Sequence, residues 1–299
     1  MKISFLGIGL MGLPMAQRLI DAHYSLTVYN RTSSKLDSLQ AGATIAPSAT
    51  AAIAASDCVI LMLTDASAIR ELLLSDSSRS QLAGRTVVQM GTISPTESQV
   101  IRDEVVAAGG DYLEAPVLGS IPEARSGSLI VMVGAEPDQF AQWAALLATF
   151  GSDPVLLGSV GSAAAVKLAL NQLIGSLTSA FAVSLGLVMR QGVDPDSFMK
   201  ILRKSALYAP TFDKKLQRML DRDYQTPNFP TKHLKKDIEL FISAARSSGL
   251  ETDGVEGVHQ ILTKAMSMSF AEMDYAALFS AICFADSAGV DPLSGEEVI

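Results

Sequence analysis

Phe5-Leu6-Gly7-Ile8-Gly9-Leu10-Met11-Gly12 is the stretch that decides the fold of this 299-residue chain. The apolar residues 2–6 predict a buried strand, and residues 11–20 predict a helix. A Gly-x-Gly-x-x-Gly turn between a strand and a helix is typical of dinucleotide binding. Gly7 permits the tight turn, Gly9 lets a pyrophosphate approach the backbone, and Gly12 lets the helix pack against the strand.

The start of this helix is an anion-binding position, because its first N–H groups are unpaired and carry partial positive charge. We therefore expect one phosphate-binding turn there. Its members would be Gly7, Gly9, Leu10, Met11 and Gly12.

Composition excludes several classes of function. The chain is 48% hydrophobic, and its formal charge of −8 argues against a nucleic-acid partner. Cys58 and Cys283 lie far apart in sequence and are predicted to be buried free thiols, which fits a reducing cytoplasm. The three histidines lack metal-ligand spacing, so we expect no metal. We also expect no signal peptide and no apolar run long enough to span a membrane.

The first half of the chain alternates short apolar runs with helical patterns. This alternation predicts a Rossmann-type, doubly wound parallel sheet whose ligand binds beyond the carboxyl ends of the strands. Helices are expected over residues 33–40 and 49–55. Further strands are expected over residues 25–30, 44–46, 58–63, 86–90, 112–117, 129–133 and 155–157.

The second half has helical patterns only. Residues 163–189 are mostly apolar and predict one long inter-domain helix, buried partly by a second subunit. We expect a cofactor-binding domain over residues 1–160 and an all-α substrate and dimerisation domain over residues 161–299. Helices are predicted over residues 195–205, 210–220, 234–248, 254–266 and 275–288, with a loop over 223–230.

The end of the second strand indicates which dinucleotide binds. NAD-binding folds place an Asp or Glu there, where it bonds the ribose hydroxyls. This chain has Asn30-Arg31-Thr32 instead. The Arg31 guanidinium can bind a 2′-phosphate, with Asn30 and Thr32 as neutral donors. The sequence therefore favours NADP over NAD.

Three further stretches carry a family resemblance. They are Glu114-Ala115-Pro116-Val117-Leu118-Gly119-Ser120, Gly158-Ser159-Val160-Gly161 followed by Lys167 and Asn171, and Lys236-Asp237-Ile238-Glu239-Leu240. With the opening glycines, and over essentially the whole chain, they resemble the β-hydroxyacid dehydrogenase family. That family includes 3-hydroxyisobutyrate dehydrogenases, tartronate semialdehyde reductases and glyoxylate/succinic semialdehyde reductases.

The resemblance implies roles for two residues that the helical repeat places on one face of the long helix. Lys167 and Asn171 are four residues apart, and a lysine on an apolar helix is costly unless it has partners or a task. The matching lysine of the family is the catalytic acid/base. Lys167 would donate a proton to the substrate oxygen, and Asn171 would orient the substrate or the lysine.

The same resemblance implies a substrate site at Leu118, Gly119 and Ser120, together with Lys167 and Asn171. The family usually has Ser where this chain has Leu118, which removes one hydroxyl donor for a substrate carboxylate. Gly119-Ser120 resembles the glyoxylate/succinic semialdehyde reductase branch, whereas residues 124–127 resemble 3-hydroxyisobutyrate dehydrogenases more.

Further cofactor contacts are implied at the ends of two later strands and on a C-terminal helix. Leu63 and Thr64 match positions that contact the cofactor's ribose and nicotinamide, as does Thr92. Lys236 matches a family lysine near the nicotinamide or substrate, with Asp237 holding it.

The sequence therefore predicts a cytoplasmic, NADPH-dependent reductase of small carboxylate-bearing aldehydes or keto acids. An alternative is a 3-hydroxyisobutyrate dehydrogenase, and an alternative of another class is a non-catalytic NADP-binding interaction module. Imine reductases share the fold, but they usually replace the lysine. The expected assembly is a homodimer or a homotetramer.

Overall fold

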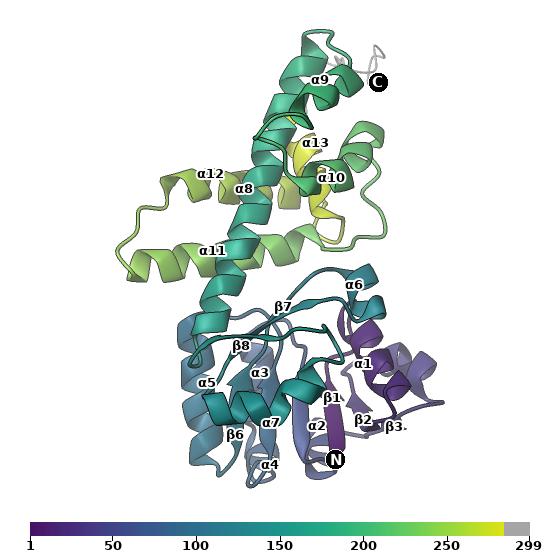
Figure 1. Cartoon of the computed structure of the whole chain (residues 1–299), viewed down its shortest axis with the longest axis vertical. Helices are drawn as coiled ribbons and strands as arrows, with labels where there is room; N and C mark the ends of the chain where they lie inside the picture. The colour runs from purple at the N-terminus through teal and green to yellow at the C-terminus, as the bar shows by residue number, and fades with distance from the viewer. Residues whose placement is uncertain (284–299) are drawn as a thin grey trace. The chain divides into compact units, whose positions relative to one another are not determined.

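The computed structural model describes residues 1–283, so the last part of the helix expected over residues 275–288 lies outside the described residues. The chain forms two compact units, one over Met1–Leu168 and one that begins at Ala169. Figure 1 shows a sheet flanked by helices in the first and helices in the second. This division falls within a long helix, a few residues after the boundary expected near residue 160.

The first unit is built on one sheet with the strand order β3-β2-β1-β4-β5-β6-β8-β7, and β9 pairs with β8. The strands are β1 (Lys2–Leu6), β2 (Ser25–Tyr29), β3 (Thr44–Ile45), β4 (Cys58–Leu61), β5 (Thr86–Gln89), β6 (Asp111–Glu114), β7 (Val117–Leu118), β8 (Ile130–Gly134) and β9 (Val155–Gly158). The parallel part, from β3 to β6, follows the predicted doubly wound arrangement.

The far side of the sheet departs from the prediction. β8 runs antiparallel to both β6 and β7, so the sheet is mixed rather than wholly parallel. The single strand expected over residues 112–117 is divided at Ala115-Pro116 into β6 and β7. Proline has no N–H to donate to a ladder, which explains the break.

Helices cover both faces of this sheet, and alternate strand residues supply the two cores. Phe5 and Ile60 belong to one buried cluster, whereas Leu6 and Leu61 belong to the other, as the two-residue repeat of a strand requires. The segment expected as a helix over residues 33–40 is a 3₁₀ helix. The helical elements are α1 (Gly12–Asp21), η1 (Ser33–Leu39), α2 (Ala49–Ala54), α3 (Ala66–Leu73), α4 (Asp76–Arg79), α5 (Pro95–Ala107), α6 (Ile121–Ser126) and α7 (Pro137–Leu147).

The second unit is helical, as predicted. Helix α8 (Ser162–Arg190) begins in the first unit and continues into the second. The remaining elements are α9 (Pro195–Leu202), α10 (Pro210–Asp221), α11 (Thr231–Ser247), α12 (Asp253–Ser267), η2 (Tyr275–Ala277) and α13 (Leu278–Cys283). Both Cys58 and Cys283 are buried free thiols, as expected.

Helix α8 is longer than the sequence predicted and is only partly buried. By length and composition alone its 29 residues could cross a membrane, so the prediction that no run would be long enough was wrong. Phe181 and Leu185 are buried against other helices of the second unit, but Leu187 is 60% exposed. The helix is therefore only partly buried within a single chain.

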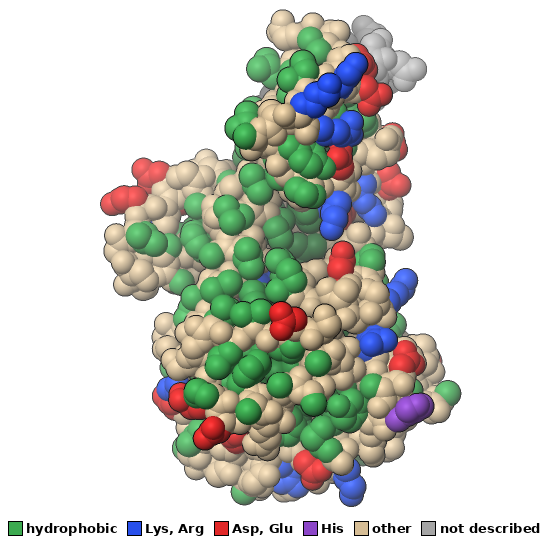
Figure 2. All heavy atoms as spheres, viewed as in Figure 1, with side chains coloured by type: hydrophobic (Ala, Val, Ile, Leu, Met, Phe, Trp, Pro, Cys, Tyr) green, Lys and Arg blue, Asp and Glu red, His purple; other side chains and the backbone are tan. Residues whose placement is uncertain are grey.

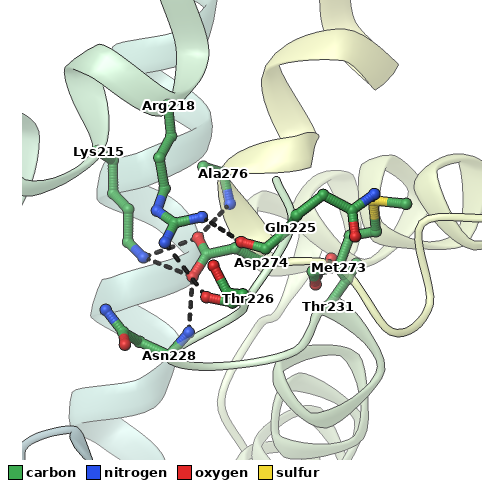
Figure 3. Close-up of polar contacts among 9 residues, drawn as sticks. All are labelled: Lys215, Arg218, Gln225, Thr226, Asn228, Thr231, Met273, Asp274 and Ala276. Carbon is green, nitrogen blue, oxygen red and sulfur yellow. Dashed lines mark hydrogen bonds and ion pairs between the residues drawn. The ribbon is translucent and has the colours of Figure 1, made fainter. Parts of the chain in front are cut away.

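A buried ion pair ties α10 to the segment before η2 (Figure 3). The Nζ of Lys215 lies 2.7 and 2.9 Å from the two carboxylate oxygens of Asp274, and 4.1 Å from the ring centroid of Tyr275. Asp274 also accepts hydrogen bonds from the N–H groups of Asn228 and Ala276. Burial lowers the pKa of Lys215, and the Asp274 carboxylate opposes that shift. These contacts fasten the loop before α11 to the helical core.

Candidate functional site

The glycine turn after β1 has the shape that a pyrophosphate needs. Gly7 has φ of +104°, and a Cβ there would lie 2.3 Å from the carbonyl oxygen of Met62. A Cβ at Gly12 would lie 2.0 Å from the carbonyl oxygen of Gly7, so α1 packs directly on the turn. At Gly9, by contrast, no described atom outside Gly9 and its two chain neighbours lies within 4 Å of a Cβ position. The glycines at 7 and 12 are required by packing, whereas Gly9 leaves space for a ligand.

The start of α1 suits an anion. Its first turn, Gly12-Leu13-Pro14-Met15, contains no acidic residue. Leu10 is 47% exposed and Met11 is half-buried. A phosphate at this position would interact with the positive end of the helix without competition from a carboxylate in the same turn.

Asn30, at the end of β2, is engaged in holding this turn. Its Oδ1 accepts a hydrogen bond from the N–H of Ile8 at 3.0 Å, and its Nδ2 donates to the carbonyl oxygen of Thr32 at 2.9 Å. The amide thus links the glycine turn to the end of β2. This contact differs from the expected role of Asn30 as a hydrogen-bond donor to the 2′-phosphate. Arg31 and Thr32 are exposed at that end.

The remaining cofactor positions of the first unit lie along the same edge of the sheet. Leu63 and Thr64 follow β4, and Thr92 follows β5. Strand β4 is a parallel neighbour of β1, and β5 is a parallel neighbour of β4. A Cβ at Gly91 would lie 2.5 Å from the carbonyl oxygen of Leu63, so the two turns are in contact. The structure therefore brings the glycine turn and these strand ends to one edge, as the topology requires.

The Leu118-Gly119-Ser120 segment joins β7 to α6. Gly119 has φ of +135°, and a Cβ there would lie 2.6 Å from Leu129 Cδ2. The Ser120 hydroxyl donates to Oε2 of Glu123 at 2.7 Å, and the Ser120 N–H donates to the same oxygen at 2.8 Å. Ser120 is thus engaged at the start of α6, so its hydroxyl hydrogen serves the helix rather than a substrate carboxylate.

Helix α8 carries the two predicted catalytic residues. Lys167 is half-buried in the first unit, and Asn171 is only 1% exposed, in the second. Asn171 Nδ2 donates to Asp237 Oδ2 at 2.6 Å, and Lys236 Nζ lies 3.0 Å from Asp237 Oδ1. Asn171 Oδ1 is buried and has no hydrogen-bond partner among the residues described. A buried acceptor of this kind fits a donor supplied by a ligand.

Two contacts of this region were not foreseen from the sequence. Asp237 was expected to hold Lys236, but it also fixes the amide of Asn171. Glu114 was quoted only as part of a motif, yet its buried side chain contacts the start of α8. Both contacts join residues far apart in the chain, so no local sequence pattern predicts them.

Comparisons with known families agree with this arrangement. Residues 2–161 match the model of the NAD binding domain of 6-phosphogluconate dehydrogenase. Residues 161–282 match the model described as NAD-binding of NADP-dependent 3-hydroxyisobutyrate dehydrogenase. The chain belongs to the β-hydroxyacid dehydrogenase family. Membership confirms the predicted class, an oxidoreductase acting on CH–OH groups, and the predicted NADP(H) cofactor.

Relatives with assigned activities cover nearly the whole chain. Glyoxylate/succinic semialdehyde reductase 2 of Arabidopsis thaliana is 32% identical over 289 residues, which is 96% of this chain and 80% of the relative. The 2-hydroxy-3-oxopropionate reductase of Escherichia coli is 29% identical and covers 94% of this chain and 97% of the relative. Human cytokine-like nuclear factor N-PAC is 27% identical, covering 94% of this chain and 51% of that protein.

Solved structures confirm the fold. The 3-hydroxyisobutyrate dehydrogenase of Salmonella typhimurium superposes with a TM-score of 0.84 at 23% identity, over 93% of this chain and 99% of that one. An imine reductase from Myxococcus stipitatus reaches a TM-score of 0.64 at 19% identity, over 93% and 98% of the two chains.

Gly9→Ala tests whether the glycine turn binds the cofactor. Because a Cβ at Gly9 would meet no described atom beyond its two chain neighbours, the free energy of unfolding of the variant should stay within about 1 kcal/mol of the parent's. The methyl group would displace a phosphate from the backbone and cost about 1.5–3 kcal/mol of hydrogen bonding. NADPH binding, measured by fluorescence titration, should weaken roughly 10- to 100-fold.

Gly257→Ala, in α12, is the matched control, because its Cβ position is equally open within the part of the chain described. It should bind NADPH like the parent. Unchanged NADPH affinity in Gly9→Ala would refute the assignment of the turn.

Proposed function

We propose that the protein is an NADPH-dependent reductase of small aldehydes or keto acids that carry a carboxylate, with glyoxylate and succinic semialdehyde as the leading candidates. The observation that carries the proposal is the pair Lys167 and Asn171 on one helix, in a chain that also has a dinucleotide-binding turn. Support also comes from the named reductases that match nearly the whole chain.

The chain would hold the cofactor at the edge of its sheet. The turn from Gly7 to Gly12 would receive the pyrophosphate, and Arg31 would form paired hydrogen bonds with the 2′-phosphate. Thr64, Thr92 and Lys236 are further contacts that we propose. When bound, NADPH supplies the hydride that reduces the substrate carbonyl.

Lys167 would act as the general acid of the reaction. Its ammonium would donate a proton to the carbonyl oxygen of the substrate, leaving an alcohol and a neutral amine that regains a proton from solvent. Asn171 would assist by accepting a hydrogen bond at Oδ1, since Asp237 occupies its Nδ2. A substrate carboxylate would lie near Leu118 and Gly119, where backbone N–H groups would supply the hydrogen bonds, because Leu118 has no hydroxyl group.

Two other functions have specific support. Oxidation of 3-hydroxyisobutyrate is favoured by the description of the second family model. A non-catalytic interaction module is the other alternative, since one relative, N-PAC, is named a nuclear factor rather than a reductase or dehydrogenase, and this chain covers about half of it. Retention of Lys167 argues against the interaction module, because such a module needs no acid/base.

A substrate panel run beside Lys167→Ala tests the reaction. NADPH oxidation should be fastest with glyoxylate or succinic semialdehyde, compared with the reverse reaction on 3-hydroxyisobutyrate and NADP⁺. Lys167→Ala should lower kcat about 10²- to 10⁴-fold, because it removes the proton donor. It should keep NADPH binding, since Lys167 is not part of the phosphate turn. A fully active variant would exclude the role, and an inactive parent would favour the interaction module.

Arg31→Asp tests the preference for NADP. The substitution replaces a donor fork by a charge that repels the 2′-phosphate, so NADPH affinity should fall roughly 100-fold. NADH affinity should change little or improve, because a carboxylate can bond the ribose hydroxyls. Lys35→Asp, on the following 3₁₀ helix, serves as a charge-matched control. Equal losses for both nucleotides would contradict this role of Arg31.

We further propose that the protein is a cytoplasmic homo-oligomer that covers the apolar face of α8. Leu173, Leu177, Val183 and Leu187 are 36–60% exposed, and the helical repeat places them on one side of the helix. Figure 2 shows exposed hydrophobic side chains over this part of the molecule. An exposed apolar stripe of this length is typical of a protein interface.

Light scattering should therefore give the mass of a dimer or a tetramer. Replacing both Val183 and Leu187 by Glu should shift the mass toward the 31.6 kDa monomer, because two charges would be buried in the interface. Val106→Glu is the control. Val106 lies on α5, in the first unit, and is 54% exposed, so its replacement should leave the mass of the assembly unaltered. A monomeric parent would refute the proposal.

A further inference from the structure

A buried carboxylate at the end of β6 caps the first turn of α8. Glu114 is 1% exposed. Its Oε1 accepts hydrogen bonds from the N–H groups of Gly161, Ala163 and Ala164 at 2.8, 2.9 and 3.1 Å. These are N–H groups that the first turn of a helix leaves without intrahelical partners. One oxygen thus satisfies three of them.

The second carboxylate oxygen is held from the other side. Glu114 Oε2 accepts a hydrogen bond from the Ser98 hydroxyl, which is also 2.9 Å from the hydroxyl of Tyr112. A Cβ at Gly134 would lie 2.4 Å from Glu114 Oε1, so the strand β8 closes the remaining space. The side chain is therefore fixed by four hydrogen bonds and by backbone packing.

The origin of this cap is unusual for a helix. Caps commonly come from the residue just before the helix, such as Ser, Thr, Asp or Asn. Here the carboxylate comes from a strand 47 residues earlier than Gly161. The first turn of α8, Ser162-Ala163-Ala164-Ala165, carries no charge of its own. The sheet therefore supplies the negative charge that the positive end of the helix favours.

The loop before α8 is held by a further contact. Gly161 has φ of +108°, and a Cβ there would lie 2.7 Å from Gln99 Nε2. The same Nε2 donates to the carbonyl oxygen of Val160 at 3.3 Å. The start of α8 is thus tied to both α5 and β6, within the first unit.

We propose that Glu114 is a positioning residue for Lys167: by fixing the first turn of α8 against the end of β6, it sets the place of the lysine relative to the cofactor edge of the same unit. Lys167 follows Ala163 by four residues and Ala164 by three, so it lies one turn above the capped N–H groups. A shift of the first turn moves Lys167 with it. This inference rests on the proposed role of Lys167.

The pKa of Glu114 is raised above its ordinary value. Burial is the largest cause, and the Ser98 hydroxyl and the N–H groups of Ala164, Gly161 and Ala163 lower the pKa only in part. The donors thus stabilise the ionised form that burial alone would disfavour.

Glu114→Gln is the test, because it keeps the length of the side chain and removes its charge. Ser98→Ala is the matched control, since it removes a hydrogen bond to Oε2 and leaves the three N–H contacts of Oε1. Amide hydrogen exchange over residues 161–167, kcat, KM and NADPH affinity are measured for both variants. Glu114→Asp, which restores the charge on a shorter side chain, reports partial rescue.

We expect Glu114→Gln to lose exchange protection at the start of α8 and to lower kcat roughly 10- to 100-fold, because misplacement of a catalytic group by about 1 Å has that effect. NADPH affinity and KM should stay within about twofold, and Glu114→Asp should recover part of kcat. Ser98→Ala should stay near the parent.

Unchanged exchange in Glu114→Gln would overturn the inference whatever the role of Lys167. Parallel losses of kcat and NADPH affinity would overturn it too, because they indicate general damage to the fold. A fully active Lys167→Ala variant would instead refute the proposed role of Lys167, and the exchange data would still decide whether Glu114 anchors the helix. If Glu114→Gln fails to fold, the contrast between Glu114→Asp and Ser98→Ala provides the same comparison.

Discussion

The hydrogen bonds between Glu114 and the first turn of α8 are the constraint on which the rest of the arrangement depends. The sheet can hold a dinucleotide at its edge, but the proposed acid/base, Lys167, lies on a helix. A helix start has several orphan N–H groups and tolerates small shifts unless they are satisfied. Because this carboxylate lies at the end of β6, it would fix the position of Lys167 relative to the ends of the strands.

Local patterns predicted much of this fold. The glycine turn, the apolar strands and the helical second unit depend on residues close in sequence, so their periodicity was visible. The direction of β8 was not, because it depends on which strands meet in space. Pro116 could have indicated the break between β6 and β7, since proline interrupts a ladder. The ion pair of Lys215 with Asp274 joins residues 59 apart and had no local signal.

The candidate site divides in the same way. Residue types, spacing and the family resemblance predicted roles for Gly9, Arg31, Lys167 and Asn171, but they did not predict the hydrogen bonds around these residues. Asn30 fixes the glycine turn through Ile8, and Asp237 fixes the amide of Asn171. Such supporting contacts depend on side-chain orientation across the fold. A sequence names the groups that perform chemistry more readily than the groups that position them.

Gly119 has a consequence for how this scaffold diversifies. Its φ of +135° would strain any other residue, a Cβ would also lie 2.6 Å from Leu129 Cδ2, and Ser120 is engaged with Glu123. Variation in this segment is therefore channelled to position 118, where a side chain can change without altering the backbone. Evolution toward new substrates would therefore act on position 118 in this segment, because the two residues that follow it are constrained by the fold.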